Sequence, residues 1–173
     1  MAHLKHDYRP LAARNIPVDI VSADAPLDGY CLVIAPALIL LSTSRAAKLQ
    51  ELVARGTHLL LTARCGRKDE YDALLPARQP GFLRDCTGVE VEEYCALAES
   101  VPVQGDGISG SATIWAERLR RLSSTTRVLA RYGASNGWLD GQAAVAQHPF
   151  GLGRVYYVGA WLKWHKRHCW SGS

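Results

Sequence analysis

Apolar runs of strand length stand near the start of the chain. IPVDIVS at residues 16–22 and CLVIAP at residues 31–36 are rich in β-branched residues, and DAPLDGY between them has the Asp, Pro and Gly of a turn. Both runs are mostly apolar, which is typical of strands covered on two faces. The pattern therefore predicts two buried strands joined by a turn.

A helix and a third strand follow. STSRAAKLQELVARG at residues 42–56 begins with hydroxyl residues that can cap a helix, has apolar residues at helical spacing and ends in a glycine. HLLLTA at residues 58–63 is a further apolar run. Strand, helix and strand in this order predict a βαβ unit, whose parallel strands need helices on both faces of the sheet.

The second half of the chain alternates between apolar and polar residues. After a charged loop over residues 65–80 and one helical turn at FLRDC, several segments have the two-residue period of strands. They are VEVEEYCAL, SATIWAERL, TRVLARY, QAAVAQ and RVYYVG. HPFGLG at residues 148–153 predicts a hairpin between the last two, so we expect a β-rich second half.

Composition narrows the class of protein. The chain has 173 residues, 48% hydrophobic and 21% charged, which suits one globular domain. No apolar run approaches the roughly 20 residues of a membrane span, and MAHLKHDYRP has no secretory signal, so we predict a cytoplasmic protein with no membrane partner. The 5 cysteines are odd in number and without a C-x-x-C pair, which disfavours a disulfide framework and a zinc ribbon.

The positive charge is concentrated at the C-terminus. The chain has 20 Lys and Arg against 16 Asp and Glu, and three of the basic residues lie in residues 163–173. Without these three the balance is 17 to 16, so the body of the chain is nearly neutral. We therefore expect no nucleic-acid partner, and a basic tail at residues 163–173 that is solvated and disordered.

LLLTARCGRKDEYD at residues 59–72 raises the question of a nucleophile. Cys65 follows a predicted buried strand, where many α/β enzymes place a catalytic Ser or Cys. The strained turn that carries such a nucleophile needs small residues on both sides of it. Cys65 is flanked by Ala63-Arg64 and Gly66-Arg67, so only one residue of each pair is small. His148 is the candidate base, with no acid two residues later. We favour a structural thiol and keep a small cysteine-dependent hydrolase or amidotransferase-like enzyme as the alternative function.

Histidines at the chain ends are candidate metal ligands. His3 with His6, and His165 with His168 and Cys169, have a spacing that can place two ligands on one helical face. Frayed ends rarely hold a preformed site, so we predict no metal.

A cluster of charges occupies the loop after the third strand. A glycoside hydrolase needs two acids held across a sugar-sized cleft, and here basic residues surround the acids instead. We therefore predict an ion-paired loop. The six charged residues are Arg64, Arg67, Lys68, Asp69, Glu70 and Asp72.

Several stretches resemble one known family. DYRPLAARNIPVDIVSADAPLDGYCLVIAPALILLS, LQELVARGTHLLLTARCGRKDEYD, GVEVEEYCAL, VLARY and GLGRVYYVGAWL follow one another as in the middle domain of family 42 glycoside hydrolases, the β-galactosidase trimerisation domain. The resemblance covers residues 8–162, and TARCGRKDEY and GLGRVYYVG are its most specific parts. Because the family normally has a further strand before residue 8, it implies an N-terminally truncated domain.

The resemblance implies a fold and a division of labour. It implies an α/β fold of the flavodoxin-like or class I glutamine amidotransferase-like kind, with a doubly wound, mostly parallel sheet, a β-rich C-terminal half and no catalytic triad. The parent enzymes hydrolyse terminal β-D-galactosides with glutamates of a separate (β/α)8 barrel. We therefore expect no catalytic residue, no cofactor and no metal in this chain, with the barrel and further copies of the domain as its partners.

The family loop is the expected interface. Arg64, Gly66, Asp69 and Glu70 match the family pattern Arg-Ser-Gly-x-x-Asp-Glu, in which Ser stands at the place of Cys65. We therefore expect Cys65→Ser to be tolerated at an accessible loop position. The full set of residues predicted to contribute to self-association, as a trimer in the parent family, is Arg64, Gly66, Lys68, Asp69, Glu70, Tyr71, Leu74 and Leu75.

Overall fold

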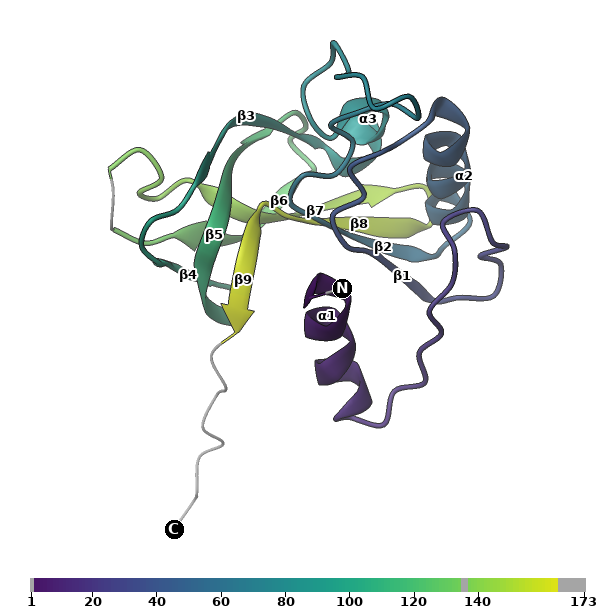
Figure 1. Cartoon of the computed structure of the whole chain (residues 1–173), viewed down its shortest axis with the longest axis horizontal. Helices are drawn as coiled ribbons and strands as arrows, with labels where there is room; N and C mark the ends of the chain where they lie inside the picture. Colours follow the sequence, from purple (N-terminus) through teal and green to yellow (C-terminus); the bar gives the residue numbers. More distant parts are fainter. Residues whose placement is uncertain (1, 135–136, 165–173) are drawn as a thin grey trace.

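One mixed sheet dominates the domain (Figure 1). The computed structural model describes residues 2–134 and 137–164, and within them nine strands run in the order β1-β2-β8-β7-β6-β4-β5-β3, with β9 paired to β5. The strands are β1 (Leu32–Ala35), β2 (His58–Thr62), β3 (Val89–Ala96), β4 (Val101–Gly105), β5 (Ile108–Arg121), β6 (Arg127–Tyr132), β7 (Ala143–Phe150), β8 (Gly153–Val158) and β9 (Ala160–Trp164). The helices are α1 (Ala2–Ala12), α2 (Thr43–Ala54), the 3-10 turn η1 (Gly81–Leu83) and α3 (Arg84–Thr87).

Only the first part of the sheet is parallel. β1 pairs with β2 and β2 with β8 in parallel, whereas the other pairings of the described strands are antiparallel. The predicted flavodoxin-like, amidotransferase-like doubly wound sheet is therefore wrong, and the domain is a β-rich mixed sheet with few helices. The segments that connect successive strands explain the difference. A doubly wound sheet needs a helical crossover between parallel strands, but from β3 onward strands follow one another through turns and short loops.

The predicted βαβ unit is confirmed at β1, α2 and β2. Ser42 caps α2 by accepting a hydrogen bond from the backbone N–H of Arg45 at 3.2 Å. The helix buries Ala46, Leu49, Leu52 and Val53, the residues at helical spacing in the sequence. It then returns the chain to β2, which lies parallel to β1 with Leu32 opposite His58.

The first predicted strand, residues 16–22, does not form. These residues belong to the extended connection between α1 and β1, and Ile16, Val18, Ile20 and Val21 are exposed. Their composition favours a strand, but a strand is stable only beside another, and no described strand lies beyond β1 at that edge of the sheet. The segment is held instead by a hydrogen bond of 2.9 Å from the Tyr30 hydroxyl to Asp19.

The predicted hairpin is confirmed between β7 and β8. The strands are paired from Val145 and Val158 to Phe150 and Gly153, so the turn is tighter than the six-residue HPFGLG stretch suggests. Gly151 has a φ of 57°, and a Cβ there would lie 2.5 Å from Cα of Ala54. The end of α2 therefore packs directly on this turn.

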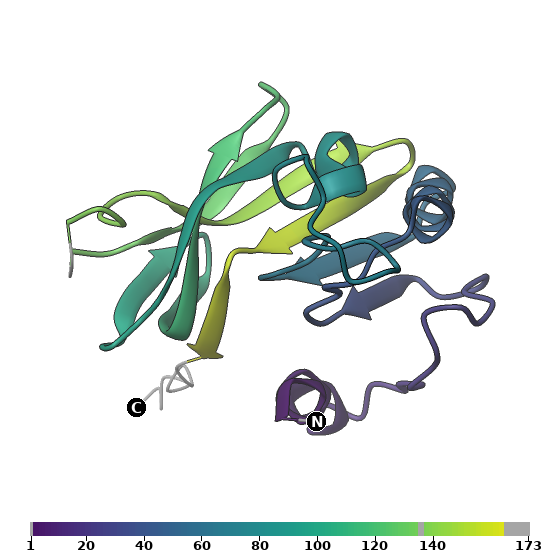
Figure 2. The same ribbon diagram turned by 45° about the horizontal axis from the view of Figure 1, so that its top comes forward.

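The helices cover the two faces of the parallel strands unevenly. In both views α2 and α1 lie on opposite sides of β1 and β2 (Figures 1 and 2). α2 packs closely, whereas a cavity of about 190 Å³ separates α1 from the sheet, with Pro10 and Leu11 facing Ile34 and Leu60 across it. None of the described helices is both long and apolar enough to cross a membrane.

The buried side chains form two clusters. The first joins α2 to β2, β8 and α3 and includes Leu52, Leu59 and Tyr157. The second fills the space within the antiparallel part of the sheet and includes Val103, Tyr132 and Leu162. The loop after β2 enters the first cluster through Cys65, so the core itself helps to fix this loop.

Candidate functional site

The loop after β2 is fastened by its backbone. Gly66 donates to the carbonyl of Leu38 at 2.9 Å, Lys68 donates to that of Ile39 at 3.1 Å, and Leu41 donates to that of Lys68 at 2.9 Å. Gly66 also has a φ of 61°, and a Cβ there would lie 2.2 Å from the carbonyl oxygen of Pro80. The two ends of the loop therefore touch at a position that only glycine fits.

The tip of the loop is a closed turn. One carboxylate oxygen of Asp69 accepts hydrogen bonds from the backbone N–H groups of Tyr71 and Ala73, each at 2.9 Å. Lys68 forms an ion pair with Asp72 at 2.8 Å. These contacts order the turn while its apolar side chains point outward, with Tyr71 85% and Leu74 65% exposed.

The predicted interface residues fall into two groups. Glu70, Tyr71 and Leu74 are exposed at the tip, together with Arg64 at the start of the loop. The others are at least partly buried and shape the loop: Gly66, Lys68, Asp69 and Leu75. The sequence therefore identified one continuous loop, but about half of the set supports the loop rather than lying on its surface.

The predicted ion-paired loop is only partly correct. Of the three basic residues, Lys68 pairs with a loop acid, but the guanidinium of Arg64 lies 5.1 Å from the ring centre of Trp115 and that of Arg67 lies 4.7 Å from that of Tyr94. Arg67 also donates to the Tyr94 hydroxyl at 2.9 Å. Aromatic rings on β3 and β5, rather than loop carboxylates, hold these two arginines.

The two rings and two guanidinium groups form a stack that we call the Arg-aromatic ladder, made of Arg64, Trp115, Tyr94 and Arg67. The rings are 5.1 Å apart and inclined by 21°. Each cation–π contact at such partly exposed sites contributes roughly 0.5–1 kcal/mol. The ladder therefore fixes both arginine side chains against the sheet at modest energetic gain.

A buried glutamate ties the start of the loop to the sheet. Glu117 on β5 is fully buried, and one of its carboxylate oxygens accepts hydrogen bonds from the backbone N–H of Arg64 at 2.8 Å and the indole N–H of Trp115 at 3.1 Å. Its other oxygen accepts from the Tyr157 hydroxyl at 2.9 Å. One carboxylate thus joins the loop, the Arg-aromatic ladder and β8.

The environment of Glu117 shifts its protonation. Burial raises its pKa from 4.5 to about 7, and the hydrogen bonds from Trp115, Arg64 and Tyr157 oppose that rise. Burial, followed by the negative charge of Glu117, raises the pKa of the Tyr157 hydroxyl, so that group stays a donor. The site can therefore bind or release a proton at the point where the loop is attached.

Sequence reasoning missed Glu117. Strict alternation along SATIWAERL places Ala116 and Glu117 on opposite faces, but both are buried. Opposite β9, the register of β5 shifts between Ala112 and Ala116, and Ile114 between them has a φ of 67°. A bulge of this kind breaks the alternation. The remaining signal was that Glu117 is the one acid of β5, in a segment whose other charged residues are arginines.

Comparison with known proteins decides the family. The profile of a family described as "Beta-galactosidase trimerisation domain" matches residues 1–168. This chain belongs to that family. The resemblance seen in the sequence is therefore confirmed, and the domain is the trimerisation domain of family 42 β-galactosidases.

Relatives of known activity are much longer than this domain. It is 34% identical to the β-galactosidase BglY of Alicyclobacillus acidocaldarius over 163 residues, which are 90% of this chain and 23% of the relative. It is 35% identical to the β-galactosidase BgaH of Haloferax lucentense over 161 residues, 92% of this chain and 24% of the relative. The trimerisation domain thus spans about a quarter of the length of these relatives.

Solved structures show the same fold. A cold-adapted β-galactosidase from Rahnella sp. R3 matches with a TM-score of 0.84 and 30% identity over 90% of this chain and 24% of that chain. A catalytic mutant of Gan42B, a family 42 β-galactosidase from G. stearothermophilus, matches with a TM-score of 0.86 and 30% identity over 94% of this chain and 23% of that one. The β-rich mixed sheet is therefore shared with about a quarter of each of these β-galactosidase chains.

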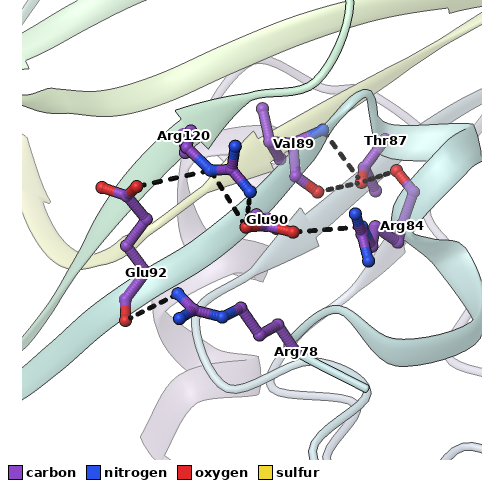
Figure 3. A network of polar contacts seen from close by, with 7 residues as sticks. All are labelled: Arg78, Arg84, Thr87, Val89, Glu90, Glu92 and Arg120. Carbon is purple, nitrogen blue, oxygen red and sulfur yellow. Dashed lines mark hydrogen bonds and ion pairs between the residues drawn. The ribbon is translucent and has the colours of Figure 1, made fainter.

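A second polar network fixes the other end of the loop in the trimerisation domain (Figure 3). Glu90 on β3 is 2% exposed and forms ion pairs with Arg84 of α3, at 3.1 Å, and with Arg120 of β5. Arg120 also pairs with Glu92 at 3.3 Å, and the backbone carbonyl of Glu92 accepts from Arg78 at 3.3 Å. Residues 78–90, which return the chain from the loop to the sheet, are therefore tied to β3 and β5.

Cys65 is not an activated nucleophile. Its side chain is fully buried, and burial, followed by the charge of Glu117, raises the pKa of the thiol far above its ordinary value. The candidate base His148 lies on β7 and hydrogen-bonds through Nδ1 to the Thr126 hydroxyl at 2.9 Å, and burial lowers its pKa. A catalytic cysteine must ionise readily and be reachable. These observations oppose the alternative enzyme function, and the expected accessible position of Cys65 is wrong.

The predicted metal candidates lie largely outside the described residues. His165, His168 and Cys169 fall there, as do the side chains of His3 and His6. In the described part of the chain no group of three or more His, Cys, Asp or Glu residues is arranged to hold a metal ion.

Proposed function

We propose that this domain joins copies of a β-galactosidase-type enzyme into a trimer and that hydrolysis of terminal β-D-galactosides takes place in a separate (β/α)8 barrel of the same parent enzyme. Membership of the trimerisation family supports the first part. The length of the relatives, of which this domain covers about a quarter, supports the second. In this proposal the self-associating domain spans residues 8–162 and continues to the end of β9, because Lys163 and Trp164 pair with β5 and do not belong to the predicted basic tail.

The observation that carries the proposal is the exposed, ordered tip of the loop after β2. Protein interfaces gain most of their affinity from large side chains that are already held in position before binding. Tyr71 and Leu74 meet that description, since they are largely exposed on a turn closed by Asp69 and by the Lys68–Asp72 pair. We infer that this tip is the apolar part of the contact between copies.

The domain on its own should associate weakly. A stable interface buries about 1,600 Å² in total, and the parent enzyme would add contacts between barrels that this domain does not supply. We therefore expect an equilibrium between monomer and trimer with a dissociation constant in roughly the micromolar range.

Two matched substitutions test the tip. Leu74→Asp should shift the domain toward the monomer, because a carboxylate would have to be desolvated at the contact. Leu152→Asp is the control, since Leu152 is 83% exposed at the β7–β8 turn. Sedimentation velocity over a concentration series measures both. Association that survives Leu74→Asp unchanged, or that falls equally in Leu152→Asp, would remove the tip from the interface.

The location of the protein is also proposed from this domain. We infer a cytoplasmic protein, because Cys31, Cys65, Cys86 and Cys95 are free thiols, and reducing compartments keep thiols in this state. Cys31 is exposed and would be the first to oxidise elsewhere.

A further inference from the structure

Two arginines of the loop carry charges that the domain leaves unneutralised at close range. Among the described residues, neither Arg64 nor Arg67 has a carboxylate oxygen within 4 Å of its guanidinium group. Both are stacked on rings of the Arg-aromatic ladder instead. Tyr94 within the ladder is 44% exposed, so the stack borders solvent.

Stacking prepares these arginines to bind a carboxylate. A guanidinium group has five N–H donors, and one placed over an aromatic ring keeps N–H groups that match a carboxylate. Arg67 uses one N–H for the Tyr94 hydroxyl and has others left. The backbone beneath it is also fixed, because Glu117 holds the N–H of Arg64 and Gly66 packs against Pro80. Little conformational freedom therefore remains to be lost on binding.

Among its described acids, the same loop has one, Glu70, whose carboxylate is exposed and not used within the loop. Asp69 is used by the backbone of the turn, and Asp72 by Lys68. Glu70 is exposed, and in the described part of the chain it forms no hydrogen bond or ion pair within 4 Å. Arg45 interacts with Glu70 only at longer range and is already paired with Asp24 at 2.7 Å.

We propose that Glu70 of one copy binds Arg67, at one end of the Arg-aromatic ladder, of the next copy. The inference rests on the proposed function, in which the tip of this loop lies at the contact between copies, and it adds the surface that receives the tip. The contact is heterologous, since an acid on one copy meets a base on another, and such contacts close into a three-membered ring when successive copies are related by a rotation of one third of a turn. Acid and base stand on one loop, so three loops meet around the ring axis.

A charge-reversal cycle on the purified domain tests the pairing. Glu70→Arg and Arg67→Glu should each weaken association about tenfold or more, because each places like charges opposite one another across the contact. Combining the two should restore the dissociation constant to within about threefold of the parent, since the pair is regained with opposite polarity. Glu99→Arg and Arg154→Glu, both at exposed positions, are the controls for the change in net charge.

The outcomes separate this inference from the proposed function. Restoration in the double variant supports the pairing. Two weakened single variants without restoration overturn it, as does an unchanged dissociation constant in either single variant. If either result is found and Leu74→Asp still abolishes association, the proposed function stands, and only the Arg-aromatic ladder is wrong as the surface that receives Glu70. A domain that stays monomeric at every concentration overturns both.

Discussion

The Glu117 carboxylate is stabilised as an anion by three hydrogen-bond donors and destabilised by complete burial. Burial is the larger effect and raises its pKa to about 7 from 4.5. Between these two values the folded domain retains a proton that the unfolded chain has released, so the free energy of unfolding falls as pH rises through this window. At about 1.4 kcal/mol per pKa unit, the loss is on the order of 3 kcal/mol.

Glu117→Gln should remove most of that pH dependence. The amide has the shape of the protonated acid and keeps one oxygen that can accept from Arg64 and Trp115, so the variant should exceed the parent in stability at about pH 8 and match it near pH 5. Urea unfolding at the two pH values measures this, with the exposed Glu99→Gln as control. Equal pH slopes in the parent and in Glu117→Gln would refute the assignment.

Cys65→Ser should destabilise the domain, contrary to the expectation from the family pattern. The hydroxyl would replace a thiol at a fully buried position, and an unpaired buried hydroxyl costs about 1–3 kcal/mol. Cys31→Ser, at an exposed position, should change stability by less than about 0.5 kcal/mol. Thermal unfolding of both variants tests the difference, and equal melting temperatures would mean that the hydroxyl finds a partner in the core.

At the scale of elements, local patterns predicted local structure well. α2, β1, β2 and the β7–β8 hairpin follow from periodicity and turn residues, because each is specified by residues within its own segment. The prediction of a strand at residues 16–22 was wrong because a strand needs a neighbouring strand to pair with, and the composition of one segment does not show whether such a neighbour exists. The parallel sheet was over-extended for a related reason, since one βαβ unit does not determine how later strands pair.

The candidate site also has a part that the sequence predicts and a part that it does not. The loop over residues 64–75 was recognised from consecutive residues, whereas its attachments come from distant strands. Glu117 and Trp115 lie about fifty residues further along the chain, and the β5 bulge hides their orientation. Ion pairing was expected between neighbours in sequence, but Arg64 and Arg67 stack on rings brought from β3 and β5.

Gly66→Ala should loosen the loop as a unit. The added Cβ would overlap the Pro80 carbonyl at 2.2 Å, and the positive φ adds strain. Gly29→Ala is a matched control, since Gly29 has a φ of 88° but nothing within 4 Å of an added Cβ. We expect Gly66→Ala to cost at least about 2 kcal/mol more than the control and to raise amide hydrogen exchange over residues 64–75. Equal costs would show that Pro80 moves aside easily.

At the scale of the whole molecule, the domain should not hydrolyse galactosides by itself. Under the proposed function the catalytic carboxylates belong to the barrel of the parent enzyme. Glu117, the buried acid at the start of the loop, uses both carboxylate oxygens in hydrogen bonds within the protein. A nitrophenyl β-galactoside assay on repurified domain should give no turnover above buffer. Turnover that co-purifies with the domain and is lost in Glu117→Gln would contradict this division of labour.

Under the proposed function, self-association of the domain depends on the loop after β2. The ordered tip and the two arginines of the Arg-aromatic ladder belong to the loop that follows β2, and Glu117 attaches this loop to β5. A cyclic trimer uses two different surfaces of each copy, and this loop offers an apolar and acidic tip beside a basic ladder. Self-association of the isolated domain is therefore the central claim.

Sedimentation equilibrium of the purified domain tests that claim most directly. Across concentrations from about 1 μM to about 1 mM, the account predicts data that fit a monomer–trimer equilibrium with a dissociation constant in roughly the micromolar range. A monomer throughout this range, or a monomer–dimer equilibrium, would contradict it.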